Sequence, residues 1–145
     1  MAAKSPARIQ YEYFRTTFRL KNPGKISAWI EQVVKSEGKV VGSLVYVFCT
    51  DSYLLKINRE YLDHDTLTDI ITFQYSDPAD RSLDGEIYIS VPRVKENART
   101  LGIDPAVEFR RVIIHGVLHL LGYGDKSKKE ENEMRRREEK WLKAW

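Results

Sequence analysis

The sequence predicts an α+β fold in which a small mixed sheet of about four strands packs with about five helices. Two observations indicate this class. Short segments rich in β-branched and aromatic residues occur between longer segments in which apolar residues return every three or four positions. The two kinds of segment follow one another through 145 residues without repeats, low-complexity tracts or linkers. We therefore expect one domain over residues 1–145, long enough to bury roughly two-thirds of its unfolded surface.

Four segments have the composition of strands: residues 9–20, 43–50, 69–75 and 85–91. The second is a continuous apolar run, which is typical of a strand buried on both faces. The fourth alternates, with Ile87 and Ile89 on one face and Glu86 on the other. Glu86 is therefore expected to face solvent.

Five segments are predicted as helices: residues 26–37, 51–62, 92–101, 105–121 and the segment that follows Ser127. Asp104 supplies an N-cap, and Pro105 takes the first helical position after it. Ser127 and Glu130 have the spacing of a capping box, which marks the start of the last helix. These signals place the boundaries of the two helices nearest the C-terminus.

The composition excludes several classes of protein. Apolar residues make up 42% and charged residues 31%, as in folded rather than disordered chains. No apolar run is long enough to span a membrane, and the N-terminus lacks the apolar core of a signal peptide, so we expect a cytoplasmic protein without a membrane partner. Cys49 is the only cysteine, which excludes an intramolecular disulfide and a cysteine-based zinc site. It is expected to be a small buried residue at a strand end.

The net charge of +3 neither demands nor excludes an anionic partner. Eight lysines and arginines are interleaved with five glutamates after residue 125. This pattern predicts a solvated helix carrying ion pairs between residues one turn apart.

The most informative residues are His115 and His119, which stand four residues apart in an apolar segment. That spacing is about one helical turn, so both imidazoles project from one face of a helix. Asp125 follows six residues later, beyond Gly122, which can end the helix and turn the chain back. Two imidazoles and one further residue are a common ligand set for Zn²⁺ or a similar ion. The third ligand is Asp125, His64, another carboxylate or solvent.

A histidine pair on a helix is also the mark of metalloproteases, in which a glutamate follows the first histidine as general base. Here that position is Gly116, which cannot transfer a proton, so a metalloprotease-like hydrolase is the weaker interpretation. A different metal hydrolase is favoured. Glu108 lies seven residues before His115 on the same helical face. It is either a partner of a metal ligand or an exposed or core-edge residue, and both interpretations remain open.

The segment from His115 to Tyr123, HGVLHLLGY, closely resembles the signature of the YbeY family, endoribonucleases that act as rRNA maturation factors. A second set of residues resembles another pattern of the same family: Ile57, Asn58, Tyr61, Asp65, Thr68, Asp69, Thr72 and Phe73. Residues 85–90 are similar to the family strand that follows. The length and the order of elements also match over nearly the whole chain.

The resemblance implies a metal-dependent, single-strand-specific endoribonuclease with a metal-hydrolase-like fold. Its role would be the maturation of the 3′ end of 16S rRNA and ribosome quality control. The implied partners are rRNA and the small ribosomal subunit, and the implied cofactor is one divalent ion, most simply Zn²⁺, with no organic cofactor. His115 and His119 match two of the family's metal ligands. The family's third ligand is a histidine, and Asp125 stands in its place.

A second departure concerns the family arginine that follows the tyrosine, because Leu62 occupies that position. Arg59 lies three residues earlier and is our candidate to replace it. The proposed catalytic residues are His115, Arg59, His64 and Asp69, and the proposed RNA-binding residues are Lys56, Arg93 and Arg111. His64 would act as a ligand, phosphate donor or proton shuttle, and Asp69 would organise the groove beside the metal. The alternative function is a non-catalytic ribosome-assembly or RNA-binding factor with a structural metal.

Overall fold

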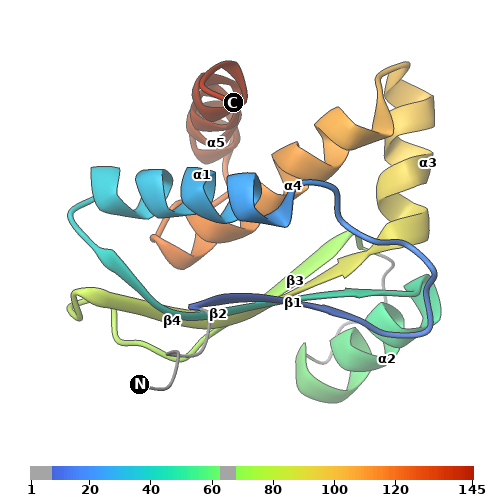
Figure 1. Cartoon of the computed structure of the whole chain (residues 1–145), viewed down its shortest axis with the longest axis horizontal. Coiled ribbons are helices and arrows are strands. Elements are labelled where there is room, and N and C mark those ends of the chain that lie inside the picture. Colours follow the sequence, from blue (N-terminus) through green and yellow to red (C-terminus); the bar gives the residue numbers. More distant parts are fainter. Residues whose placement is uncertain (1–7, 63–67) are drawn as a thin grey trace, which may run out of the picture.

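The computed structural model describes residues 8–62 and 68–145, and Figure 1 shows their arrangement. In chain order the elements are β1 (Ile9–Tyr13), α1 (Pro23–Ser36), β2 (Val40–Cys49), α2 (Asp51–Leu62), β3 (Ile70–Gln74), β4 (Ser82–Ser90), α3 (Val91–Leu101), α4 (Pro105–Leu120) and α5 (Lys128–Lys143). The described residues thus form four strands and five helices. The predicted α+β fold with a small sheet is confirmed.

The sheet is mixed, with the strand order β1-β2-β4-β3. β1, β2 and β4 are parallel, and β3 pairs antiparallel to β4 at one edge. In Figure 1, α1 and α4 cover one face with α5 above them, α2 lies on the opposite face, and α3 stands at one end of the sheet. No described helix combines the length and the apolar character that crossing a bilayer requires.

The main core lies between the sheet and the α1–α4 layer. Tyr46 and Ile87, which are paired across β2 and β4, are fully buried against helix residues such as Ile30 and Ile113. Complete burial of each such apolar side chain contributes roughly 1.5–3 kcal/mol. A smaller cluster lies beneath α2 on the other face and consists of Cys49, Leu54, Ile57 and Ile71. Cys49 is buried at the end of β2, as predicted.

Three strand boundaries differ from the prediction by three residues or more, and the first is the start of β2, at Val40 rather than at residue 43. β1 ends at Tyr13 rather than at residue 20, because Arg15 adopts a left-handed backbone conformation with φ 54°. β4 begins at Ser82, three residues before the predicted start, since its polar first residues pair with β2. The prediction for Glu86 holds only in part: this side chain is partly buried and accepts a 2.6 Å hydrogen bond from the Tyr88 hydroxyl.

Helix α4 lies unusually close to the sheet at Gly116. A Cβ atom at this position would stand 3.0 Å from Ile70 Cδ1 and 3.0 Å from Ile87 Cγ2. Glycine therefore allows α4 to pack closely on β3 and β4, whereas a larger residue would push the helix outward. At the start of the helix, the Asp104 side chain accepts a hydrogen bond from the Ala106 amide, as the sequence predicts. These contacts fix the helix that carries both histidines next to the edge strand β3.

Candidate metal centre

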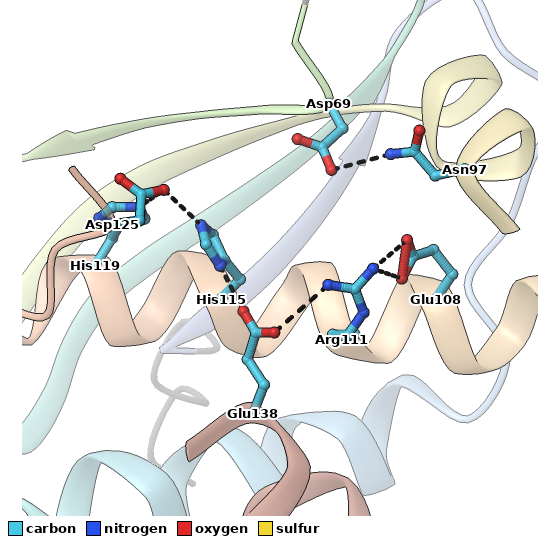
Figure 2. Close-up of polar contacts among 8 residues, drawn as sticks. All are labelled: Asp69, Asn97, Glu108, Arg111, His115, His119, Asp125 and Glu138. Carbon is cyan, nitrogen blue, oxygen red and sulfur yellow. Dashed lines mark hydrogen bonds and ion pairs between the residues drawn. The ribbon is translucent and has the colours of Figure 1, made fainter. Parts of the chain in front are cut away.

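The three predicted ligands meet at the end of α4. Asp125 Oδ2 lies 3.2 Å from His119 Nε2 and 3.6 Å from His115 Nε2. One ligand atom from each residue lies within 4.8 Å of the others. Figure 2 shows both imidazoles projecting from α4 and Asp125 approaching them from the following loop. The structure therefore brings together the three residues that the spacing selected.

The loop that carries Asp125 is held at both ends. At the end of α4, Gly122 has φ 105°, a conformation that favours glycine, and the Tyr123 amide donates a 3.0 Å hydrogen bond to the Leu118 carbonyl. At the start of α5, Ser127 and Glu130 form the predicted capping box. This short, anchored turn returns the carboxylate to the histidines, and the Tyr123 hydroxyl also donates a 2.9 Å hydrogen bond to Glu37 at the end of α1.

The donor set fits a divalent metal. Tetrahedral zinc bonds of about 2.0–2.1 Å place neighbouring ligand atoms roughly 3.3 Å apart, which agrees with the separations of 3.2 and 3.6 Å at Asp125. Imidazole nitrogen and carboxylate oxygen are both ordinary zinc ligands. The side chains of His115, His119 and Asp125 are 20%, 27% and 44% exposed. Three protein ligands with an exposed side are typical of catalytic rather than structural zinc sites.

A cavity of about 290 Å³ adjoins the cluster between α4 and β3. Its walls comprise the three candidate ligands together with Thr68, Asp69, Ile70, Thr72, Arg111 and Val112. A larger cavity of about 440 Å³ lies elsewhere, beside Phe18, Phe109 and Trp145, and neither histidine lines it. Because the three candidate metal ligands line the smaller cavity, we take that cavity as the candidate active site.

Buried charged groups lie directly behind His115. Its Nδ1 is 2.5 Å from Oε2 of Glu138, a residue of α5. The other Glu138 oxygen lies 3.5 Å from Arg111 Nη1, and Arg111 Nη2 donates a 2.6 Å hydrogen bond to Glu108 Oε2 (Figure 2). Glu108 is fully buried and contacts Arg111 rather than a histidine. Glu108 is therefore neither a direct partner of the described candidate ligands nor an exposed residue.

The sequence analysis missed Glu138. It assigned the glutamates of the last helix to a solvated face, yet Glu138 is only 3% exposed. One signal was available: Met134 and Trp141 lie four residues before and three after Glu138, so the three share one helical face that the apolar residues direct inward. A glutamate on such a face requires a buried partner, and His115 and Arg111 supply it.

The environment of His115 favours the charged imidazole in the metal-free protein. Burial opposes the charge, but the hydrogen bond to Glu138 and the negative charges of Glu138, Asp125 and Asp69 outweigh it and raise the pKa of His115 above its ordinary value. A cluster of anionic groups around two imidazoles attracts a cation in the same way.

The other predicted site residues divide into three groups: those that line the cavity, those that do not, and those outside the described residues. Asp69 and Arg111 line the cavity, where Asp69 also accepts a 3.4 Å hydrogen bond from Asn97. Arg93 is not among the residues that line it and pairs with Asp51 at 2.9 Å. Lys56 and Arg59 are exposed on α2, on the opposite face of the sheet from α4 (Figure 1). His64 and Asp65 lie outside the described residues.

The fold and the cluster together define a candidate metal-hydrolase. The sequence model of the family described as Endoribonuclease YbeY matches residues 12–145, and the chain belongs to this family. The resemblance predicted from the two sequence motifs is therefore confirmed.

Several relatives carry the name "Endoribonuclease YbeY". The chain is 46% identical to the one from Amoebophilus asiaticus over 95% of this chain and 93% of the relative. It is 51% identical to one from Porphyromonas gingivalis over 81% and 76% of the two chains. Among solved structures, it is similar to the solution structure of TM1509 from Thermotoga maritima, with a TM-score of 0.64, 28% identity and coverage of 93% and 85%.

Proposed function

We propose that this chain is a metal-dependent, single-strand-specific endoribonuclease that acts in rRNA processing. The observation that carries the proposal is the convergence of His115, His119 and Asp125 beside an open cavity. Membership of a family whose relatives are named endoribonucleases supports RNA as the substrate. We propose the 3′ end of 16S rRNA and defective ribosomes as targets, and hence the small ribosomal subunit as partner and the cytoplasm as location.

Zn²⁺ is the ion that best fits two imidazoles and a carboxylate at these separations. When bound, a divalent ion supplies Lewis-acid chemistry at a phosphodiester oxygen and makes water a better nucleophile at neutral pH. The chain itself would hold the ion through His115, His119 and Asp125. Asp69, on the cavity wall facing α4, is positioned to orient a water or hydroxyl group of the substrate.

Positively charged side chains would bind the RNA backbone. Lys56 and Arg59 lie on α2, and Arg93 and Arg111 are each about one-third exposed while paired with carboxylates. Contacts of this kind give affinity that falls as salt rises, because each neutralised phosphate releases bound counterions. Arg59 is our candidate for the function of the family arginine that Leu62 replaces. His64 would assist as a phosphate donor or proton shuttle.

A second candidate function is a non-catalytic assembly factor with a structural metal. Leu62 in place of the family arginine favours it, since a side chain proposed to contact phosphate is missing. Binding of RNA without cleavage would support this alternative.

The test compares metal-loaded wild type with His115→Ala and Asp125→Ala on an rRNA fragment that has a single-stranded 3′ tail. Asp80→Ala, an exposed carboxylate in the loop between β3 and β4, is the matched control. Wild type and control should cleave, whereas both ligand variants should lose metal and cleavage. Equal cleavage by all four proteins would point to a contaminating nuclease and overturn the proposal. His64→Ala should retain its metal; loss of metal in that variant but not in Asp125→Ala would assign the third ligand to His64.

A further inference from the structure

We infer that Glu138 is a positioning residue for the metal centre: its carboxylate holds His115 with Nδ1 toward α5 and Nε2 toward the metal. This inference rests on the proposed metal site and concerns a residue outside the ligand set. Glu138 lies 23 residues beyond His115 and on another helix, so only the packing of α5 on α4 brings the two together.

The first argument is the opposed orientation of the two ring nitrogens. Nδ1 of His115 lies 2.5 Å from Glu138 Oε2, while Nε2 of the same ring lies 3.6 Å from Asp125 Oδ2. A carboxylate can only accept a hydrogen bond, so the hydrogen of the neutral ring belongs on Nδ1. Nε2 then keeps its lone pair, and this is the atom that faces the other two candidate ligands (Figure 2). Metal-binding histidines commonly have such a partner, which fixes both tautomer and ring orientation.

The second argument is that Glu138 is itself held in place. Its side chain is 4% exposed, and its second oxygen lies 3.5 Å from Arg111 Nη1. Arg111 is in turn fixed by two contacts to Glu108, whose side chain is fully buried. A carboxylate restrained on both oxygens cannot rotate away from His115 without losing contacts that balance its own buried charge, which is strongly unfavourable.

The third argument is the charge of the group. Two buried carboxylates, Glu108 and Glu138, face one guanidinium, that of Arg111. The ion pair with Glu108 alone would balance the charge of Arg111, so the second carboxylate is not needed for that purpose. The additional negative charge of Glu138 is directed at His115, where it favours positive charge on the ring or on a cation that the ring binds.

The test measures zinc affinity by competition with a chelator in Glu138→Ala, in the nearly isosteric Glu138→Gln, and in the control Glu139→Ala. Glu139 is the exposed neighbour on the same helix. We expect the zinc dissociation constant to rise about 10–100-fold in Glu138→Ala and about tenfold in Glu138→Gln, the usual range for losing a partner of a metal-binding histidine. The control should match wild type. Equal zinc affinity in wild type and Glu138→Gln would overturn the inference.

A second measurement is made on the metal-free protein and does not depend on enzymatic activity. With ¹⁵N-labelled histidine, couplings between ring nitrogens and carbon-bound hydrogens show which nitrogen carries the hydrogen of the neutral ring. At a pH high enough for the ring to be neutral, wild-type His115 should show hydrogen on Nδ1 alone, and Glu138→Ala should shift toward hydrogen on Nε2. His64→Ala and His119→Ala assign the signals. Hydrogen on Nε2 in the wild type would overturn the inference even if the Glu138 variants fail to fold.

The outcomes separate this inference from the proposed function. If His115→Ala and Asp125→Ala bind zinc as wild type does, the metal site itself is wrong. If these variants lose zinc while the Glu138 variants bind it normally, the site stands and only the role of Glu138 is rejected.

Discussion

The two regions that carry the family motifs are built in different ways. The metal-centre region, comprising α4, the loop to α5 and α5 itself, backs its ligands with buried charged groups: Glu108 is 0% and Glu138 is 3% exposed. The last turn of α2, which carries Tyr61 of the second motif, ends with Tyr61 69% and Leu62 40% exposed. Other residues of that motif, Thr68, Asp69 and Thr72, line the cavity beside the histidines. The metal-centre region is restrained by the protein interior, whereas the last turn of α2 presents its side chains at the surface.

This difference indicates a division of tasks. Metal binding requires ligand atoms placed to within about half an ångström, which packing and buried partners provide. Contacts with an extended RNA need reach and positive charge more than fixed geometry. Substitutions in the metal-centre region should therefore change metal content, whereas substitutions on α2 should change RNA binding and leave the metal in place.

The largest expected contrast is between His119→Ala and Arg59→Ala. Removing a metal ligand should abolish stoichiometric zinc and lower cleavage at least about 100-fold, because both Lewis-acid and water activation are lost. Removing Arg59 should leave the zinc content unchanged and lower kcat/KM about tenfold, the value of one charge-assisted contact. Elemental analysis and cleavage assays on the same preparations measure both. Loss of zinc in Arg59→Ala would show that the two regions are not separable.

Stability should respond strongly where α4 packs on the sheet. In Gly85→Ala, the new Cβ would lie 2.7 Å from the Phe73 carbonyl oxygen and 2.9 Å from Leu120 Cδ1. The Phe73 carbonyl belongs to the backbone of the paired strand β3 and cannot move without disturbing the sheet. We therefore expect a loss of about 2–4 kcal/mol in the free energy of unfolding. Gly24→Ala in the first turn of α1 is the matched control, because nothing lies within 4 Å of its added Cβ. Urea unfolding curves compare the two. A loss below about 1 kcal/mol for Gly85→Ala would show that this part of the sheet adapts more easily than the packing indicates.

Leu62 stands where the family has an arginine, and replacing it gives a test with a smaller effect, in which the activity is expected to rise. Leu62→Arg restores the residue type that the family has at this position, on an exposed turn where a long side chain fits without displacing the core. We expect kcat/KM to rise roughly three- to tenfold through one added phosphate contact, with zinc content unchanged. Leu62→Gln, which adds length without charge, is the control. Equal gains in both variants would assign the effect to something other than charge.

The sequence predicted the local part of this site well and the non-local part poorly. His115 and His119 follow from helical periodicity, and Asp125 follows from Gly122 and the short turn to the Ser127 cap. Each of these depends on neighbours within a few residues. Glu138 depends on how α5 packs on α4, and its charge made it resemble the solvated residues around it.

Glu86 shows the same limit on the sheet. Strand alternation correctly separates it from Ile87 and Ile89, which are fully buried on the inner face. Alternation does not reveal what covers the other face. There the Tyr88 hydroxyl donates to Glu86, and the ring of Phe73 lies 5.8 Å from that of Tyr88. Periodicity thus assigns a residue to a face, and only tertiary structure shows whether that face meets solvent.

The smallest expected effect concerns Cys49, which lies beneath α2 and can report on that region alone. Burial, with a contribution from the charge of Asp51, raises the pKa of the Cys49 thiol from 9.0 to about 12. The folded state therefore favours the protonated thiol. This contribution to stability is fully present below about pH 9 and is lost as the pH rises toward 12. Alkylation of the native protein at pH 8 should be slow and limited by transient opening of α2.

Removing the metal should leave this alkylation rate within about twofold, because opening of α2 does not require release of ligands on the other face of the sheet. Alkylation with and without a chelator, followed by mass spectrometry, measures the effect at Cys49, the only cysteine. Ile71→Val, which trims a neighbour of Cys49 in the cluster beneath α2, is the positive control and should accelerate alkylation. A tenfold slowing by metal would mean that the thiol is exposed only by global unfolding, since a ligand that binds only the folded state suppresses that route in proportion to its occupancy. The metal-centre region and α2 would then form one cooperative unit rather than two.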